Sequence, residues 1–209
     1  MIHSVYISQV QEAKILVWEI NESAAELQSL LTNFDAYSVE YKEIKLEKRR
    51  LEFLAARIAL NTLLGREVKI IYNDDGKPFL SDNSQNISIS HSGNRVAVMA
   101  HPEIQVGIDI EKRSERFLTL YKRYLSENEQ IELNKGKDAL IRLQLAWSAK
   151  EAMYKVFGDE VLDFTKDIRI LDFNFCNNNG FIYAEHIKQQ KNYLLQYVSD
   201  EKYNLVWID

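Results

Sequence analysis

The sequence has little of what marks several classes of protein. Among its 209 residues, one is cysteine, two are proline and seven are glycine. Cys176 alone cannot form an internal disulfide, so a small disulfide-stabilised fold is excluded and a reducing cytoplasm is expected. The scarcity of proline and glycine argues against a disordered or collagen-like chain.

Long apolar runs and a strong positive charge are also missing. No run approaches the length of a membrane span, and the first residues do not form a basic segment followed by an apolar one. We therefore expect no membrane anchor and no signal peptide. The formal net charge of −5 argues against nucleic acid or an anionic membrane as the main partner. The length suffices for one good core or two small ones.

The periodicity predicts an α+β fold made of two similar α/β halves with pseudo-twofold symmetry, residues 1–104 and 105–209. Each half runs from a strand through helices to antiparallel strands. Strands are expected at 14–20, 68–72, 87–90, 95–100, 106–111, 167–176, 181–187, 193–199 and 203–208. Helices are expected at 23–31, 38–64, 114–125, 127–134 and 138–157. A capping box at Ser23 and Glu26, a stop at Gly65 and a hairpin turn at the Asn179-Gly180 end of residues 177–180 mark three boundaries.

The stretch VGIDIE, residues 106–111, is typical of a short strand. Its β-branched residues share one face, while Gly107, Asp109 and Glu111 share the other. The two carboxylates lie roughly 7 Å apart along the strand. A hard divalent cation would relieve their repulsion, and an all-oxygen set favours Mg²⁺ or Mn²⁺ over zinc. Taken alone, the stretch fits better as an ordinary strand end with solvated acids.

Two further segments of the first half could contact a base or a phosphate. In GKPFL, residues 76–80, Lys77 is a cation beside the flat face of Pro78; a hairpin turn with a solvated lysine fits equally well. In NISISHSG, residues 86–93, a strand ends on Ser90, His91 and accessible backbone N–H groups, which suit a phosphate. A histidine in a turn, with its hydrogen bonds made to backbone groups, is slightly favoured over a phosphate site. The segment lacks the nucleophile-elbow pattern of a serine hydrolase.

The helical segment WSAKEAMYK, residues 147–155, places Glu151 and Lys155 on one face, with Lys150 about 100° round the helix. Glu151 and Lys155 could form an ordinary surface pair that stabilises the helix by about 0.2–0.5 kcal/mol. Alternatively, Glu151 could be a third carboxylate for the cation, and the lysines could bind a polyphosphate. The basic stretch after the acidic strand is either a solvated face or a docking surface for an acidic partner. It comprises Lys112, Arg113, Arg116, Lys122 and Arg123.

These four segments, in this order, resemble the 4′-phosphopantetheinyl transferase superfamily. The resemblance covers residues 76–155 and is to the longer, surfactin-synthetase-activator type, in which one chain holds two α/β halves. It implies the fold of that family and a holo-[acyl-carrier-protein] synthase type enzyme. Such an enzyme moves the phosphopantetheine arm of coenzyme A to a serine of an apo acyl or peptidyl carrier protein and releases adenosine 3′,5′-bisphosphate. It implies Mg²⁺ dependence and a monomer with the active site between the halves.

The resemblance also assigns residue roles. Asp109, Glu111 and Glu151 would hold Mg²⁺ (Mn²⁺ as a substitute) against the pyrophosphate. Glu151 would deprotonate the incoming serine, directly or through water, and Lys155 would neutralise charge on the leaving group. The basic stretch would dock the carrier. The residues that would contact coenzyme A are Arg57 at the 3′-phosphate, Lys77 and Pro78 at the adenine, and Ser90, His91, Lys150 and Lys155 at the phosphates.

Two residues near these motifs are predicted to be structural. Glu129 lies where the family often has an acid, but it completes a capping box with Ser126. Trp147 is expected to be a residue of its helix that packs into the hydrophobic core. Two other functions also fit the sequence: a Mg²⁺-dependent phosphotransfer enzyme or pyrophosphohydrolase acting on small nucleotides, and a non-catalytic module that binds coenzyme A or a carrier. The sequence does not identify the carrier, the tolerance of acyl-coenzyme A, the general base or the oligomeric state.

Overall fold

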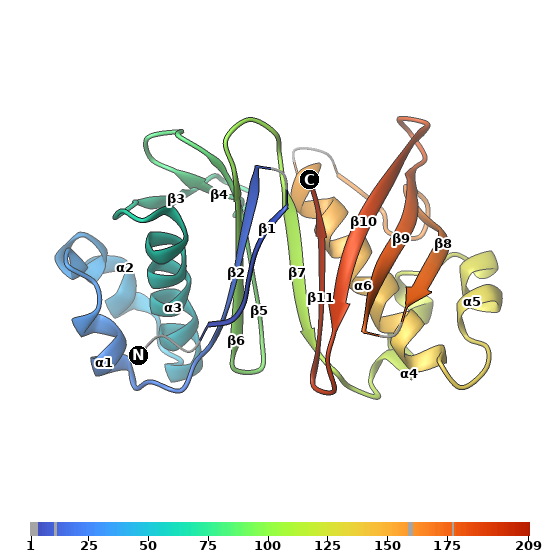
Figure 1. Ribbon diagram of the computed structural model, residues 1–209, viewed down its shortest axis with the longest axis horizontal. Helices are drawn as coiled ribbons and strands as arrows, with labels where there is room; N and C mark the ends of the chain where they lie inside the picture. The colour runs from blue at the N-terminus through green and yellow to red at the C-terminus, as the bar shows by residue number, and fades with distance from the viewer. Residues whose placement is uncertain (1–3, 11, 159–160, 177) are drawn as a thin grey trace. The chain divides into compact units, whose positions relative to one another are not determined.

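The computed structural model describes residues 4–10, 12–158, 161–176 and 178–209. The chain divides into two compact units, Met1–Ile104 and Gln105–Asp209, here called unit 1 and unit 2. Each unit combines antiparallel sheet with helices (Figure 1), which confirms the predicted α+β class. Among the described residues, no helix is both long and apolar enough to cross a membrane.

Unit 1 is built on a four-stranded antiparallel sheet in the order β1-β2-β6-β5, with a separate two-stranded β3-β4 sheet. The strands are β1 Ser4–Val10, β2 Ala13–Glu19, β3 Ile70–Tyr72, β4 Pro78–Leu80, β5 Asn86–Ser92 and β6 Arg95–His101. Strands β2, β5 and β6 lie within a few residues of their predicted positions. Strand β1 had not been predicted; it pairs with β2.

The helices of unit 1 are shorter and more numerous than predicted. They are α1 Ala24–Ser29, the 3₁₀ turn η1 Phe34–Tyr37, α2 Ser38–Glu43 and α3 Glu47–Leu64. The capping box at Ser23 and Glu26 and the left-handed stop at Gly65 are confirmed. The single helix expected over 38–64 is wrong, because Ile44 and Leu46 are extended. Val39 and Leu46 are largely exposed, so the buried stripe of α3 does not continue through them.

Helix α3 covers one face of the four-stranded sheet (Figure 1). Leu54 and Ile58 from the helix share a buried cluster with Trp18 of β2 and Val96 and Val98 of β6. Burial of large apolar side chains of this kind stabilises a fold by about 1.5–3 kcal/mol each. This packing fixes the face of α3 that carries Arg57 and the strand β5 that carries His91.

Unit 2 is built on a five-stranded antiparallel sheet in the order β7-β11-β10-β9-β8. The strands are β7 Gly107–Lys112, β8 Ile168–Cys176, β9 Asn179–His186, β10 Lys191–Ser199 and β11 Tyr203–Ile208. The helices are α4 Phe117–Leu120, the 3₁₀ turn η2 Tyr121–Arg123, α5 Glu127–Leu133 and α6 Ala139–Val156. The predicted helix at 114–125 is therefore reduced to a short helix and a turn. Helix α6 lies along one face of the sheet (Figure 1).

The hairpin between β8 and β9 differs from the prediction at Asn179-Gly180. Residue 177 lies outside the described residues, but β9 already begins at Asn179, so the Asn-Gly pair belongs to the strand. A Cβ on Gly180 would lie 2.1 Å from the carbonyl oxygen of Asn174 and 2.7 Å from the hydroxyl of Tyr197. Glycine is thus required here by the close approach of two neighbouring strands, not by a turn.

Candidate functional site

The acidic strand β7 and helix α6 cross in direct backbone contact. A Cβ built on Gly107 would lie 1.9 Å from the carbonyl oxygen of Ala152 and 2.9 Å from a methyl of Val156. Because Gly107 has no side chain, the helix backbone can approach the strand this closely. Asp109 and Glu111 lie on the same strand face as Gly107, so both acids face α6.

One face of α6 meets β7 along its length. Gln144 donates to the carbonyl oxygen of Lys112 at 2.8 Å, and Trp147 Nε1 donates to Glu111 at 3.2 Å. Further along the helix, Lys155 Nζ donates to the carbonyl oxygen of Ile108 at 2.7 Å. Contacts three, four or eight residues apart on a helix lie on one side of it. Glu151 occupies this face between Trp147 and Lys155.

The two acids of β7 each pair with a cationic side chain of unit 2. Asp109 is buried, and its Oδ1 accepts a hydrogen bond from Lys155 Nζ at 3.1 Å. Glu111 accepts two hydrogen bonds from Arg116, at 3.1 and 3.0 Å, one on each carboxylate oxygen. The charges of this strand face are therefore partly balanced within unit 2.

The carboxyl group of Glu151 has a raised pKa. Its burial raises its pKa to about 7, helped by the negative charge of Asp109 and, less strongly, of Glu111, while Lys155 opposes the shift. The three acids expected to hold a cation thus act on one another electrostatically. Among the described residues, no three Asp, Glu, His or Cys side chains are gathered tightly enough to hold a metal ion as they stand.

The three carboxylates nevertheless suit a hard divalent cation in their chemistry. All their donor atoms are oxygens, the preference of Mg²⁺ and Mn²⁺. A bound cation would offset the burial of Glu151 and its repulsion by Asp109, the two main causes that raise its pKa. It would also have to displace Lys155 or Arg116 from the acids of β7, because these two cations now hold the carboxylate oxygens.

Lys150, which was expected to assist at the phosphates, directs its ammonium group to partners other than the acids of β7. Its side chain is fully buried, and its ammonium donates to Glu129 and to the carbonyl oxygens of Phe164 and Ile168, the last two at 2.7 Å. Every hydrogen of the ammonium group therefore has an acceptor inside unit 2. Lys150 is a structural cation.

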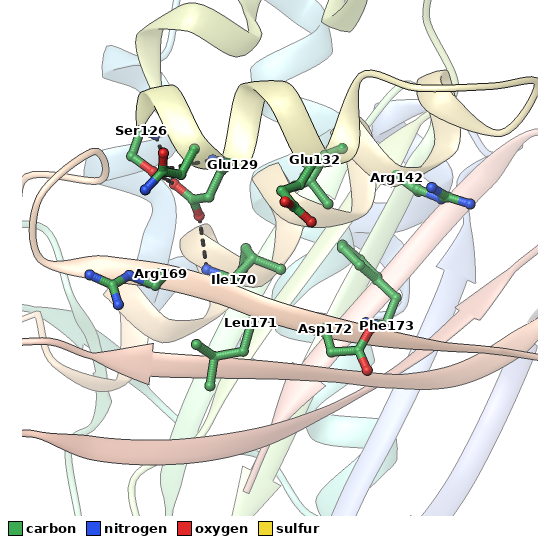
Figure 2. A pocket seen from close by; sticks show the side chains of 11 residues that line it. Ser126, Glu129, Glu132, Arg142, Arg169, Ile170, Leu171, Asp172 and Phe173 are labelled. Atoms are coloured by element: carbon green, nitrogen blue, oxygen red, sulfur yellow. Dashed lines mark hydrogen bonds between the residues drawn. The ribbon is translucent and has the colours of Figure 1, made fainter.

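Glu129 is structural as predicted, and it does more than cap a helix. It forms the capping box with Ser126 at the start of α5, and its Oε1 accepts from the backbone N–H of Ile170 at 2.8 Å. Figure 2 shows this bond at the inner wall of a pocket of about 540 Å³ between α5 and β8. Glu129 and Lys150 thus each bond one backbone group of β8, an edge strand of the sheet: the N–H of Ile170 and the carbonyl oxygen of Ile168.

The basic stretch is exposed, but its members are held differently. Arg116 is turned back to Glu111. Arg113 instead donates to Ser199 Oγ at 2.8 Å, and its backbone N–H donates to the carbonyl oxygen of Lys202 at 2.7 Å. The stretch is therefore not one uniform array of solvated cations.

Unit 1 holds a pocket of about 500 Å³ that gathers several of the expected coenzyme A residues. Arg57 of α3, Pro78 of β4 and His91 of β5 line it. The remaining lining residues are Ile44, Arg49, Glu52, Phe53, Ala56, Tyr72, Gly76 and Ile89. The pocket thus combines an apolar, partly aromatic wall with cations, as a nucleotide site would require.

Arg57 forms part of the wall and is fully buried. Its guanidinium lies 3.3 Å from the ring centre of Phe53 and 4.7 Å from that of Tyr37, and it pairs with Glu40 at 3.2 Å. Burial lowers the pKa of Arg57, although an arginine keeps its charge at neutral pH. Its Nε has no hydrogen-bond partner among the described residues.

Two expected residues are absent from the pocket lining. The pleat of β5 sends Ser90 to the face opposite His91, so the two do not line the same pocket. Lys77 adjoins Pro78 on the chain but is not among the lining residues, and its backbone N–H donates to Asn73 Oδ1. The expectation that Ser90 and Lys77 act beside His91 and Pro78 is not supported by this pocket.

Sequence reasoning missed Arg49 and Glu52. Arg49 donates to Glu52 at 2.9 Å and lies 3.1 Å from Nε2 of His91, while Glu52 lies 3.5 Å from Nδ1 of the same ring. Arg49 is eight residues before Arg57 on α3, which places both on one helix face. The spacing between Arg49 and Arg57 was the sequence signal that could have identified Arg49.

The comparisons with known proteins agree with the motif evidence. Residues 105–206 match the family model described as "4′-phosphopantetheinyl transferase superfamily". The chain is 30% identical over 115 residues to the 4′-phosphopantetheinyl transferase AcpT of Salmonella typhimurium, covering 53% of this chain and 60% of that protein. It is 30% identical over 158 residues to the human L-aminoadipate-semialdehyde dehydrogenase-phosphopantetheinyl transferase, covering 63% of this chain and 50% of that protein.

A third relative is the phosphopantetheinyl transferase of a Thraustochytrium species, 27% identical over 177 residues. That match covers 68% of this chain and 62% of the relative. The matched segments therefore span 50–62% of the length of these three relatives.

Proposed function

We propose that this chain, whose residues 105–206 match the family model of the 4′-phosphopantetheinyl transferase superfamily, transfers the phosphopantetheine arm of coenzyme A to a serine of an apo carrier protein. The relatives described above are named as phosphopantetheinyl transferases, which supports the proposal. The observation that carries the proposal is the set of three interacting carboxylates beside Lys155 on β7 and α6. Phosphoryl-type transfer needs alignment and charge neutralisation of this kind more than it needs a covalent intermediate.

Asp109, Glu111 and Glu151 would hold Mg²⁺, with Mn²⁺ as a substitute. Their oxygen donors and mutual repulsion support this assignment. When bound, the cation would neutralise the pyrophosphate of coenzyme A and polarise its phosphorus centre. The side chains of Lys155 and Arg116, which now pair with Asp109 and Glu111, would have to move aside to admit it.

The reaction we propose is a single displacement at the phosphorus atom that carries the pantetheine arm. The serine Oγ of the carrier forms a bond to this phosphorus, and the bond from the phosphorus to the bridging pyrophosphate oxygen breaks. Adenosine 3′,5′-bisphosphate leaves. The serine proton passes to the Glu151 carboxylate, directly or through water.

Lys155 would neutralise charge on the leaving group. Its ammonium group already lies 3.1 Å from Asp109, and its side chain is 23% exposed, so it can shift to a substrate oxygen. Lys150 is left out of this machinery, because its ammonium is fully buried with three acceptors.

The pocket of unit 1 would bind the nucleotide end of coenzyme A. Its aromatic and proline wall suits a purine, and Arg49, Arg57 and His91 suit phosphate groups. The orphan Nε of the buried Arg57 supports a ligand there. The prediction that the active site lies between the two halves stays a prediction.

The acidic carrier would dock on Lys112, Arg113, Lys122 and Arg123, which are exposed. We further propose the surfactin-synthetase-activator type, supported by the division of the chain into two units that each combine antiparallel sheet with helices. The holo-[acyl-carrier-protein] synthase activity, the monomeric state and the cytoplasmic location remain predictions.

The test is mass spectrometry of several apo-carriers incubated with coenzyme A and Mg²⁺. We expect one carrier class to gain a single phosphopantetheine arm, and the same carrier with its acceptor serine replaced by alanine to gain nothing. Asp109→Ala should abolish the gain while its circular dichroism spectrum stays that of a folded protein.

Other outcomes would identify a different function. Hydrolysis of coenzyme A or another nucleotide without any carrier would indicate a pyrophosphohydrolase. Binding of coenzyme A or a carrier without modification of any carrier tested would indicate a non-catalytic module. An Asp109→Ala variant that keeps most of its turnover in Mg²⁺ would contradict the metal assignment.

A further inference from the structure

We propose that Arg116 is an internal counter-ion of Glu111 and competes with the divalent cation for its carboxylate. The inference rests on the proposed function, because it takes Glu111 as one of the cation's ligands. It concerns a residue that the sequence had placed on the docking surface for the carrier. The structure places its guanidinium at the acid cluster instead.

The contact between the two side chains is a two-pronged one. Arg116 donates to Glu111 Oε1 at 3.1 Å and to Oε2 at 3.0 Å. The planar fork of a guanidinium matches the two oxygens of a carboxylate, which makes such pairs the stronger and more specific ones. The guanidinium also lies over the ring of Phe117, 4.8 Å from its centre. Arg116 is therefore held in place both by the charge and by a buried ring.

A carboxylate offers about four acceptor positions, two on each oxygen. Arg116 takes one position on each oxygen of Glu111, and Trp147 Nε1 takes a further one on Oε1 at 3.2 Å. Release of Arg116 frees an acceptor position on each oxygen, while the bond from Trp147 keeps the carboxylate oriented. Trp147 thus positions Glu111, and Arg116 neutralises it.

The pair is also exposed enough to open. The side chain of Arg116 is 53% exposed, against 14% for Glu111. Ion pairs with one well-solvated partner are weak, so the competition should alter cation affinity only by roughly three- to tenfold. A pair of this strength lowers the affinity for the cation but does not prevent its binding.

Arg113 provides a matched comparison on the same segment. It carries the same charge and is also exposed, but its side chain donates to Ser199 Oγ and not to Glu111. Loss of either arginine changes the net charge of the chain equally. Only loss of Arg116 removes the two bonds to Glu111.

The experiment measures binding of Mn²⁺ alone to the full chain, by the loss of the electron paramagnetic resonance signal of free Mn²⁺. The proteins compared are the wild type, Arg116→Gln, Arg113→Gln and Glu111→Gln. We expect Arg116→Gln to bind Mn²⁺ roughly three- to tenfold more tightly than the wild type, and Arg113→Gln to match the wild type. Glu111→Gln should bind much more weakly. The ratio between Arg116→Gln and wild type should shrink as KCl is raised, because salt screens the exposed pair.

The outcomes separate this inference from the proposed function. Equal or weaker binding by Arg116→Gln, with binding lost in Glu111→Gln, would overturn the role of Arg116 and leave the metal site standing. Equal gains in Arg116→Gln and Arg113→Gln would also overturn it, because the effect would then come from net charge. If neither wild type nor Arg116→Gln bound Mn²⁺, both the inference and the metal assignment would be wrong.

Discussion

Lys150 Nζ lies 2.8 Å from Oε1 of Glu129, and almost no part of either side chain is exposed to solvent. The two residues are 21 positions apart and join helix α6 to the first turn of α5. The same carboxylate accepts from the backbone of Ile170 on β8, as Figure 2 shows. This pair therefore ties the helix that carries Glu151 to two other elements of unit 2.

Lys150→Met should destabilise the protein strongly. It leaves the carboxylate of Glu129 buried without its cation, and breaking a buried pair from one side typically costs about 3–5 kcal/mol. The free energy of unfolding measured in urea checks this. The double variant Glu129→Gln/Lys150→Met should lose less than the sum of the two single variants, because it leaves no uncompensated charge.

Lys188→Met is the control for that measurement. Lys188 pairs with Asp167 at 2.9 Å, but its side chain is 56% exposed. An exposed pair of this kind contributes about 0–1 kcal/mol. A loss in Lys150→Met no larger than that in Lys188→Met would contradict the structural role of Lys150, and would return it to the candidates for phosphate binding.

The burial of Lys150 also shows where sequence reasoning ends. The WSAKEAMYK motif predicted Glu151 and Lys155 on one face of their helix, because helical spacing is a local property. In the structure this is the face of α6 that meets β7. The partner of Lys150 depends on α5 and β8, which no local pattern connects to α6. A lysine beside a functional motif looks like part of the site until the packing of its neighbours is known.

Gly107→Ala should disturb the site through the backbone. The added Cβ would lie 1.9 Å from the carbonyl oxygen of Ala152, next to Glu151 on α6. The helix would have to move away from β7, at a cost of about 1–3 kcal/mol. We expect lower stability together with a drop in kcat, measured by urea unfolding and by transfer to the carrier.

Gly136→Ala separates steric contact from backbone strain. Gly136 has a φ of +73° and nothing within 4 Å of its added Cβ. Its replacement should cost about 1 kcal/mol from the left-handed backbone and leave kcat unchanged. Equal kinetic effects from both variants would show that the contact between Gly107 and Ala152 does not position Glu151.

Local patterns predicted some elements of both kinds. Alternation located β5, and the capping box located the start of α1. The break between α2 and α3 was missed because Leu46 is apolar and continues the helical pattern. In the structure it is 67% exposed, so the pattern did not indicate a buried helix face there. Whether an apolar residue is covered depends on the tertiary fold, which composition and periodicity do not encode.

The stability of the metal-free protein should fall as pH rises from about 4.5 to about 7. In the folded protein the pKa of Glu151 is raised from 4.5 to about 7, chiefly by burial and next by Asp109. Between these values the folded state binds more protons than the unfolded state, so raising the pH favours unfolding. The effect is at most about 3 kcal/mol and levels off above pH 7.

Urea unfolding in the presence of a chelator at several pH values checks this, with Glu151→Gln as the comparison. The difference in stability between Glu151→Gln and wild type should grow through this window and then stay constant. Mn²⁺ affinity of the wild type should rise over the same range, because the ligand must lose its proton. A pH-independent difference between the two proteins would contradict the raised pKa.

Arg49→Gln should weaken the binding of coenzyme A by roughly tenfold, as expected for loss of one charged hydrogen bond to a phosphate. Arg49 lines the pocket of unit 1 and lies 3.1 Å from Nε2 of His91. Isothermal titration with adenosine 3′,5′-bisphosphate should give a similar loss, because the nucleotide end would occupy this pocket. Arg50→Gln is the matched control: its Nε donates to the carbonyl oxygen of Ile44, and it is not among the pocket's lining residues. If both variants kept wild-type affinity for both ligands, Arg49 would have no part in binding the nucleotide, whatever the acids of unit 2 do.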